Sequence, residues 1–241
     1  MKTGKDLANI QHHTVHVNGI DMHFASTGDR GRPLLLFLHG FPEFWYAWKD
    51  MLLHFGSRCY AVAPDLRGIN LSGKPAETKA YRARYAVEDI RALAEYLGYK
   101  EFVLVGHDWG GAISWAYGMT YPEQLPGLVQ INAVHPALYA RELAGNRAQQ
   151  EASAYINFFR SSRAEALLCA NDHSYLIDMF REAGELPEWF DAATNTTCRW
   201  ESLLCARARR TPLACFRSIR AAPPARHTRR DRRSTVSRHW H

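Results

Sequence analysis

The stretch "LVGHDWGGAISW", Leu104 to Trp115, places an aspartate between an apolar run and a segment with helical spacing. Gly106 stands two residues before Asp108 and Gly110 two residues after it, so small residues flank the carboxylate. A strand that turns sharply into a helix exposes the side chain at the tip of the turn. The stretch therefore predicts either a nucleophile at such an elbow or, more simply, an aspartate that caps the helix.

Strand and helix patterns alternate around this turn. Apolar runs typical of buried strands occur at 33–40, 57–68, 101–106 and 125–134. Helical spacing occurs at 43–55, at 85–99 with an end at Gly98, and at 111–122, and two short strands around Asn18-Gly19 come first. Short connections between alternating elements predict an α/β fold with a mostly parallel sheet. From about residue 137 to 191, aromatic-rich helical patterns replace the strands and predict a helical cap.

A second motif, "LHGFPEFWYAW" from Leu38 to Trp48, follows the strand that we expect beside the strand leading to Asp108. A backbone N–H in this turn, together with that of the residue after a nucleophile, forms an oxyanion hole. Here these groups belong to Phe41 and Trp109. The alternative is an ordinary turn rich in Gly and Pro. Both motifs in the right order at consecutive strand ends favour the catalytic interpretation.

Composition excludes several classes of protein. No run of 18 apolar residues predicts a membrane span, and the N-terminal stretch is not typical of a signal peptide. The five cysteines have no metal-ligand spacing, which favours reduced thiols, a cytoplasmic location and no metal or cofactor. The net charge of +6 is unevenly placed: residues 199–241 hold twelve Arg and two acids, or +10, whereas the remainder carries −4. The basic segment lacks interleaved aromatics, so we expect no nucleic-acid partner.

Residues 14 to about 197 resemble the α/β-hydrolase superfamily, in particular its branch of epoxide hydrolases and haloalkane dehalogenases. The matching motifs are "HGFPEFWYAW", "PDLRGINLSGKP" and "GHDWGG". The resemblance implies an α/β-hydrolase fold with a helical cap and an aspartate nucleophile, which separates this branch from serine esterases. It assigns the nucleophile to Asp108, the oxyanion hole to the backbone of Phe41 and Trp109, and substrate contacts to His39, Pro42 and Trp109.

"HGFPE" and "HDWGG" together are more similar to epoxide hydrolases than to dehalogenases. The cap segment "SAYINFFR" resembles the place where epoxide hydrolases carry a lid tyrosine, which implies that Tyr155 donates a hydrogen bond to the epoxide oxygen. An aromatic core residue of the cap is the alternative for Tyr155. The expected partners are a small apolar epoxide, or a halide if the chain is a haloalkane or haloacid dehalogenase, and water. The oligomeric state is left open.

Two polar residues near the motifs are assigned structural roles. The side chain of His107 should point away from its neighbour Asp108, which favours packing over catalysis. Asp65 in "PDLRG" is expected to hold its loop through Arg67.

The acid and the histidine that complete a hydrolase triad are not found by pattern. Some members of the family carry the acid after the strand that here ends in "LVQIN", where this chain has Asn132. The histidines after Asp108 fall in or beside the cap or in the basic segment: His135, His173, His227, His239 and His241. In this family two more strands are expected after the cap, and no apolar run in the sequence predicts them.

From about Cys198, lysines disappear, arginines multiply and hydrophobic periodicity fades. We therefore expect a core at 1–136, a partial cap at 137–197, and a disordered or frame-shifted segment at 198–241. The hypothesis is a reading-frame change near residues 194–200 that leaves a catalytically incomplete hydrolase. A protein that binds ligands without turnover is the alternative outside enzymes.

Overall fold

A computed structural model describes residues 7–168, 170–171, 174–175 and 178 of the protein. Six strands form one sheet in the order β1-β2-β4-β3-β5-β6. Their bounds are β1 Gln11–Val17, β2 Ile20–Thr27, β3 Leu34–Leu38, β4 Tyr60–Pro64, β5 Val103–His107 and β6 Gly127–Ile131. Strands β3 to β6 run parallel, and β1 and β2 form an antiparallel hairpin that joins β4. The α/β fold with a mostly parallel sheet is confirmed.

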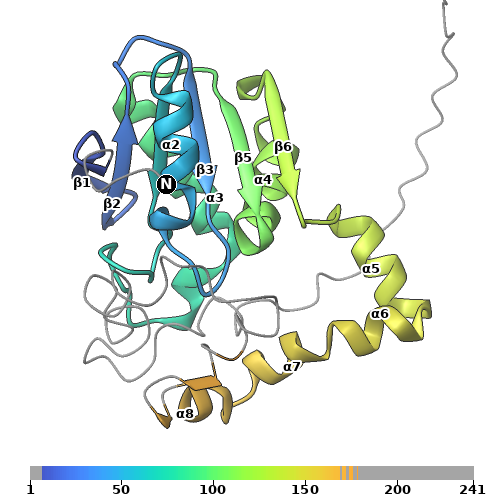
Figure 1. Cartoon of the computed structure of the whole chain (residues 1–241). Helices are drawn as coiled ribbons and strands as arrows, with labels where there is room; N and C mark the ends of the chain where they lie inside the picture. Colours follow the sequence, from blue (N-terminus) through green and yellow to red (C-terminus); the bar gives the residue numbers. More distant parts are fainter. Residues whose placement is uncertain (1–6, 169, 172–173, 176–177, 179–241) are drawn as a thin grey trace, which may run out of the picture.

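Helices cover both faces of this sheet (Figure 1). Helix α2 lies on one face, and α3 and α4 lie on the other. The core helices and short 3₁₀ turns are η1 Trp45–Trp48, α2 Lys49–Phe55, η2 Thr78–Tyr81, α3 Ala83–Leu97, α4 Asp108–Thr120 and η3 Pro122–Gln124. The helix predicted over 43–55 is thus a 3₁₀ turn followed by α2, a common way for a helix to begin.

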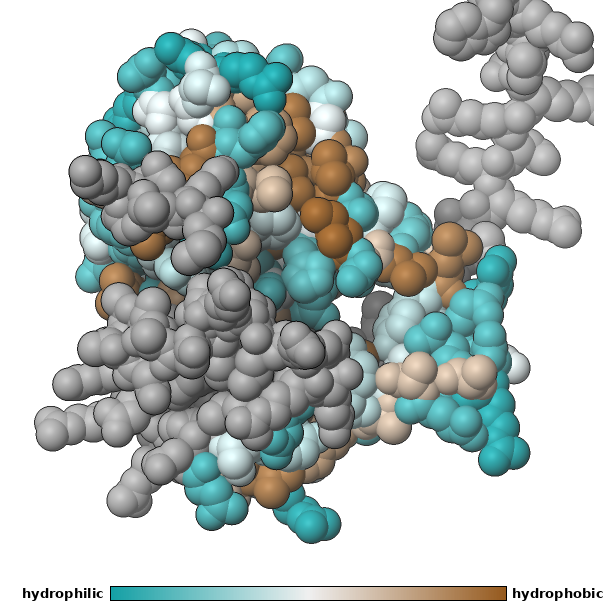
Figure 2. Space-filling view, viewed as in Figure 1, coloured by the Kyte–Doolittle hydropathy of each residue, from teal (hydrophilic) through white to brown (hydrophobic). Residues whose placement is uncertain are grey.

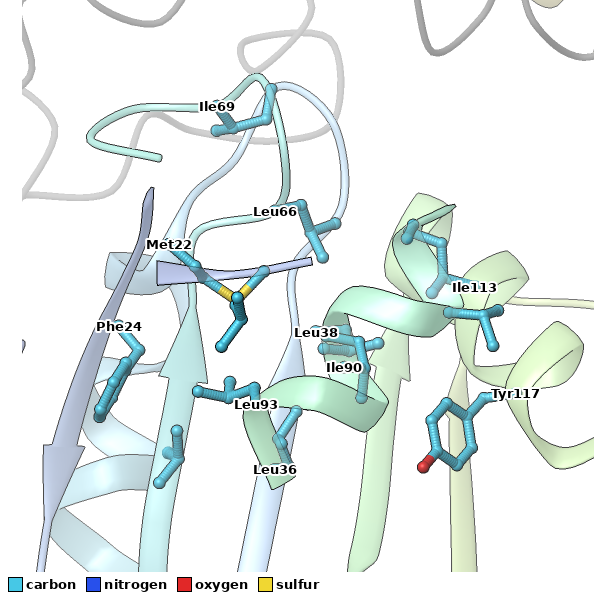
Figure 3. Close-up of a cluster of buried hydrophobic side chains, with 14 of the residues drawn as sticks. Met22, Phe24, Leu36, Leu38, Leu66, Ile69, Ile90, Leu93, Ile113 and Tyr117 are labelled. Carbon is cyan, nitrogen blue, oxygen red and sulfur yellow. The ribbon is translucent and has the colours of Figure 1, made fainter. Parts of the chain in front are cut away.

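Alternation along β3 explains the two-sided core. Leu34, Leu36 and Leu38 point to the side of α3 and α4, whereas Phe37 packs with Leu52 of α2 on the opposite face. Figure 3 shows the first cluster, in which Leu36 and Leu38 lie near side chains from α3. Because both faces are covered, β3 is a continuous apolar run rather than an alternating one.

The ends of the local elements follow the turn chemistry of the sequence. The β1–β2 turn places Asn18 at φ 46° and Gly19 at φ 76°, the left-handed conformations that a two-residue hairpin requires. Helix α3 ends at Leu97 because Gly98 adopts φ 88° and its N–H donates to Ala94 and Glu95. Both predictions are confirmed.

Asp65 has the predicted structural role of holding its loop, but the predicted partner, Arg67, is wrong. The buried Asp65 carboxylate accepts from His23 Nδ1 at 2.7 Å, from Asn70 Nδ2 at 2.8 Å and from the Trp45 N–H at 3.0 Å. Arg67 instead pairs with Asp89 of α3, with Nε 2.6 Å from Oδ2. A carboxylate at the end of β4 lies beside β2, so tertiary neighbours replace the expected neighbour in sequence.

After β6 the chain continues as helices. They are α5 Pro136–Gly145, α6 Arg147–Ala152, α7 Ala154–Arg160 and α8 Ala164–Leu168, and Figure 1 shows them leading away from the β6 edge. Phe159 of α7 and Leu168 of α8 return to the main core. No helix in the described ranges has the length and apolarity that crossing a bilayer demands. The proposed segment 198–241 lies outside the described residues, so its predicted character stays a prediction.

Candidate active site

The turn from β5 into α4 places Asp108 at the carboxyl end of the central parallel strands (Figure 1). Asp108 adopts φ 50°, a left-handed conformation that is uncommon for a residue with a side chain. Such strain persists only where the surroundings hold it, and it concentrates at functional sites. Asp108 is half-buried and lies at the first position of α4.

Glycines make this turn sterically feasible. A Cβ on Gly106 would lie 2.3 Å from Ser114 Oγ, and one on Gly110 would lie 2.3 Å from the Leu38 carbonyl oxygen. Both distances are far below van der Waals contact, and at Gly110 the obstacle is backbone that cannot rotate away. The glycines flanking Asp108 therefore let α4 pack directly on the ends of β3 and β5.

The oxyanion loop, defined here as residues 39–43, meets Asp108 across the end of β3. The Phe41 N–H donates to Asp108 Oδ1 at 3.0 Å. A Cβ on Gly40 would lie 2.7 Å from the Asp108 Cβ, so only glycine allows this approach. The second predicted donor, Trp109, occupies the first turn of α4, where backbone N–H groups have no intrahelical acceptor. The structure thus brings Phe41, Asp108 and Trp109 together.

Glu43 and His107 form a pair that the sequence patterns did not reveal. His107 Nδ1 donates to Glu43 Oε2 at 3.0 Å, and the same oxygen accepts the Gly40 N–H at 3.1 Å. The hydrogen bond to Glu43 raises the pKa of His107 above its ordinary value, although burial opposes it. Burial raises the pKa of Glu43, but His107 and the Gly40 N–H outweigh it, and the net pKa is lowered. His107 is therefore a hydrogen-bond partner of Glu43, and forms an ion pair with it when protonated, rather than being the packing residue we expected.

His39 does not offer its side chain to a substrate, contrary to the prediction. The residue is 1% exposed, its Nδ1 donates to the Gly40 carbonyl at 2.8 Å, and its Nε2 accepts the Leu66 N–H at 3.0 Å. Burial lowers the pKa of this imidazole and favours the neutral ring that both hydrogen bonds require. His39 thus links the oxyanion loop to the loop after β4.

Helix α7, in the segment predicted as a cap, contacts the oxyanion loop through aromatic rings. Phe159 packs edge-on against Phe41 with centroids 5.5 Å apart, and Tyr155 packs edge-on against Phe159 at 5.7 Å. Burial raises the pKa of Tyr155, and the charge of Asp108 adds to this effect. The predicted lid tyrosine therefore lies within the electrostatic influence of the predicted nucleophile, even though 46% of the residue is exposed.

The remaining predicted substrate contacts are Pro42 and Trp109. Pro42 is buried, and Trp109 is half-buried and packs against the main core cluster. Both stand beside Asp108 by virtue of the oxyanion loop and the first turn of α4. Their contact with a substrate stays a prediction. Among the described residues, no group of three His, Cys, Asp or Glu side chains is arranged to hold a metal ion.

Asn132 and His135, which follow β6, were considered for the acid and the histidine of a catalytic triad. Asn132 adopts φ 50° at the end of β6 and is exposed. His135 caps α5 by accepting the Ala137 N–H at 3.2 Å, and its ring packs edge-on against Trp115 at 4.8 Å. Within the ranges that the structure describes, no histidine ring hydrogen-bonds to Asp108. The later histidines, 173, 227, 239 and 241, lie outside those ranges.

A family model described as "alpha/beta hydrolase fold" matches residues 33–189, which include the oxyanion loop, the elbow and the cap helices. The chain belongs to the α/β-hydrolase family. Its sequence is 40% identical to epoxide hydrolase 4 of Mus musculus over 164 residues, covering 68% of this chain and 46% of the mouse protein. Over 172 residues it is 33% identical to epoxide hydrolase 1 of Caenorhabditis elegans, covering 71% of this chain and 43% of that relative.

Solved structures of epoxide hydrolases share the fold of this α/β hydrolase. A variant of the Bacillus megaterium enzyme, complexed with its product (R)-3-[1]naphthyloxy-propane-1,2-diol, matches with a TM-score of 0.76 and 35% identity. The match covers 85% of this chain and 71% of that structure. An epoxide hydrolase from Vigna radiata matches with a TM-score of 0.71 and 29% identity over 88% of this chain and 72% of its own. The α/β hydrolase described here thus spans about half the length of the mouse relative and most of these structures.

Proposed function

We propose that this α/β hydrolase opens an epoxide with Asp108 as the nucleophile and forms a covalent ester. The observation that carries the proposal is the hydrogen bond of 3.0 Å from the Phe41 N–H to Asp108 Oδ1. It distinguishes the two carboxylate oxygens, because Oδ1 is held by the loop and Oδ2 is left to attack. Similarity to epoxide hydrolases over two thirds of the chain supports an epoxide as the electrophile.

In the first step Asp108 Oδ2 forms a bond to an epoxide carbon, and the bond from that carbon to the ring oxygen breaks. The ring oxygen takes up the electron pair and receives a proton from the Tyr155 hydroxyl. Oδ1 becomes the carbonyl oxygen of the ester and keeps its hydrogen bond to Phe41. The raised pKa of Tyr155 supports this role, since it keeps the hydroxyl protonated until an alkoxide forms.

In the second step water attacks the ester carbonyl carbon, and negative charge develops on Oδ1. The Phe41 N–H, and the Trp109 N–H as a second donor, stabilise that charge. Water needs a base, however, and the histidines nearest the elbow are engaged: His107 with Glu43 and His39 with backbone groups. We propose that the residues described here carry out ester formation and that none of them supplies the base for ester hydrolysis.

The substrate class follows from the rings around the elbow. Phe41, Trp109 and Phe158 are half-buried and pack against the main core cluster, and Phe159 joins them from α7. Rings of this kind favour an apolar substrate whose polar atoms are few and placed at the reacting end. We therefore propose an epoxide with an apolar or aromatic substituent rather than a charged one.

Mass spectrometry of the intact protein after incubation with a reactive aromatic epoxide tests the nucleophile. The unsubstituted chain should gain the mass of one epoxide, and Asp108→Ala should gain none. Asp50→Ala, a variant of an exposed carboxylate on α2, is the matched control and should form the adduct normally. An adduct that persists in Asp108→Ala, or one formed only with chloroalkanes, contradicts the proposal.

Tyr155→Phe tests the proton donor because it keeps the ring packing on Phe159 and removes only the hydroxyl. The rate of ester formation should fall by about 10²-fold or more if the hydroxyl acts as a general acid. Tyr96→Phe, at an exposed tyrosine of α3, controls for the loss of a surface hydroxyl. A rate equal to that of the unsubstituted chain would return Tyr155 to a packing role in the cap.

A further inference from the structure

Two backbone N–H groups of the oxyanion loop donate to carboxylates: that of Gly40 to Glu43 and that of Phe41 to Asp108. Gly40 N–H donates to Glu43 Oε2 at 3.1 Å, and the Glu43 N–H donates back to the Gly40 carbonyl at 3.1 Å. The same carbonyl accepts from His39 Nδ1 at 2.8 Å. Both polar groups of Gly40 are therefore engaged inside the loop, and the next N–H, that of Phe41, is the one directed at Asp108.

Glu43 also joins the loop to the elbow itself. Its Oε2 accepts from His107 Nδ1 at 3.0 Å, and His107 immediately precedes Asp108. One carboxylate oxygen thus holds the loop after β3 and the last residue of β5. The two side chains are partly shielded, with 29% of His107 and 24% of Glu43 exposed, so water competes only weakly with the pair.

We propose that Glu43 is a positioning residue that clamps the oxyanion loop to the elbow and so places the Phe41 N–H on Asp108 Oδ1. It does not touch the reacting atoms. Its effect on ester formation passes through two contacts: the Gly40 N–H fixes the loop, and His107 fixes the start of the turn. The inference rests on the proposed function only where it concerns the rate of ester formation.

The geometry separates two variants of Glu43. Glutamine has a carbonyl oxygen at the same position, so Glu43→Gln retains acceptors for Gly40 and His107 and loses only the charge. Alanine removes both acceptors and leaves the Gly40 N–H without its partner. Because a misplaced catalytic contact of about 1 Å can cost about 10²-fold in rate, Glu43→Ala should slow ester formation by about 10- to 10²-fold. Glu43→Gln should stay within about 3-fold of the unsubstituted chain, since the distances set by its oxygen are unchanged.

Two measurements test the clamp together. The first is the single-turnover rate of ester formation at saturating epoxide, compared with the epoxide concentration that gives half of that rate. A positioning role lowers the saturating rate and leaves the half-saturating concentration nearly unchanged. The second is hydrogen exchange of the backbone amides of Gly40 and Phe41, followed by NMR without substrate. These amides should exchange at least about 10-fold faster in Glu43→Ala and normally in Glu43→Gln.

Glu95→Gln and Glu95→Ala are the matched controls, because Glu95 is an exposed carboxylate on α3 that pairs with Arg91 far from the elbow. They should change neither measurement. Unchanged Phe41 exchange in Glu43→Ala overturns the inference, as does a Glu43→Gln variant that behaves like Glu43→Ala. If the unsubstituted chain forms no ester, the proposed nucleophile fails, and the amide exchange of Gly40 and Phe41 still decides whether Glu43 is a clamp.

Discussion

The residues that follow the neighbouring strands β5 and β6 have the same φ angle but different surroundings. His107 of β5 and Ile131 of β6 are partners in the parallel register, and the residue after each, Asp108 and Asn132, adopts φ 50°. Asp108 receives the Phe41 N–H and lies against Gly40. Asn132 is exposed, in a segment whose large apolar residues Val129, Ile131, Val134 and Leu138 are exposed as well.

Figure 2 shows hydrophobic surface over the β6 side of the molecule. Strand β6 is at the edge of the sheet, whereas the elbow follows β5, which lies between β3 and β6. A left-handed residue after a parallel strand therefore does not make a site by itself. Asp108 differs because the loop after β3 lies on its other side and the Phe41 N–H of that loop donates to its carboxylate. At β6, no described strand plays that part, since β6 is the last in the sheet order.

The largest expected difference between the elbow and the segment after β6 is the change in unfolding free energy when a glycine is replaced by alanine. Gly110→Ala places a Cβ 2.3 Å from the Leu38 carbonyl oxygen and should lower the free energy of unfolding by about 3 kcal/mol. Gly145→Ala at the end of α5 meets nothing within 4 Å and should change it by less than about 1 kcal/mol, in the stabilising direction. Urea unfolding of both variants measures the two values. Equal losses would mean that the elbow is no more tightly packed than the edge.

A second pair of variants compares the strands themselves. Val105 and Val129 are partners in register, yet Val105 is 6% exposed and Val129 is 46% exposed. Val105→Thr buries a hydroxyl and should cost about 1–3 kcal/mol of unfolding free energy. Val129→Thr should stay within about 0.5 kcal/mol, because water still reaches its side chain. A comparable cost at Val129 in urea unfolding would show that this face of β6 is covered in solution.

The smallest expected effect is a pH dependence that belongs to the elbow alone. Folding raises the pKa of His107 above 6.5, so its contribution to stability is full below pH 6.5 and is lost as the pH rises through the folded value. Folding lowers the pKa of Glu43 below 4.5, so its contribution is present above pH 4.5 and is lost as the pH falls through the folded value. The pair therefore stabilises the fold most between about pH 4.5 and 6.5.

Unfolding free energies of the unsubstituted chain and of the variant carrying both Glu43→Gln and His107→Gln measure this effect across pH. Their difference should be largest inside that window and should shrink on both sides. A difference that does not vary with pH would mean that Glu43 and His107 are not an ion pair.

The sheet, the tight turn at Asp108 and the loop after β3 could be predicted from the sequence, whereas an oxyanion role for that loop stays a prediction. Each rests on a signal contained in a few consecutive residues: an apolar run long enough for a buried strand, glycines two residues from Asp108, and a Gly-Phe-Pro turn after β3. Local sterics and burial on both faces restrict what such segments form, so the pattern is informative without knowledge of neighbours. The β1–β2 turn and the end of α3 at Gly98 belong to the same class.

Only the tertiary structure decided the polar partners. Glu43 and His107 are 64 residues apart, and His23 and Asp65 are 42 apart, so no spacing in the sequence announces either pair. The errors on His39, His107 and Asp65 share this cause, because each side chain was assigned from its sequence neighbours. Hydrogen bonds between buried polar groups depend on which strand lies beside which, and the order β4-β3-β5 is set by packing of the whole sheet. The sequence pattern therefore located the turn at Asp108, whereas the hydrogen bonds that hold this turn follow from the order of the strands.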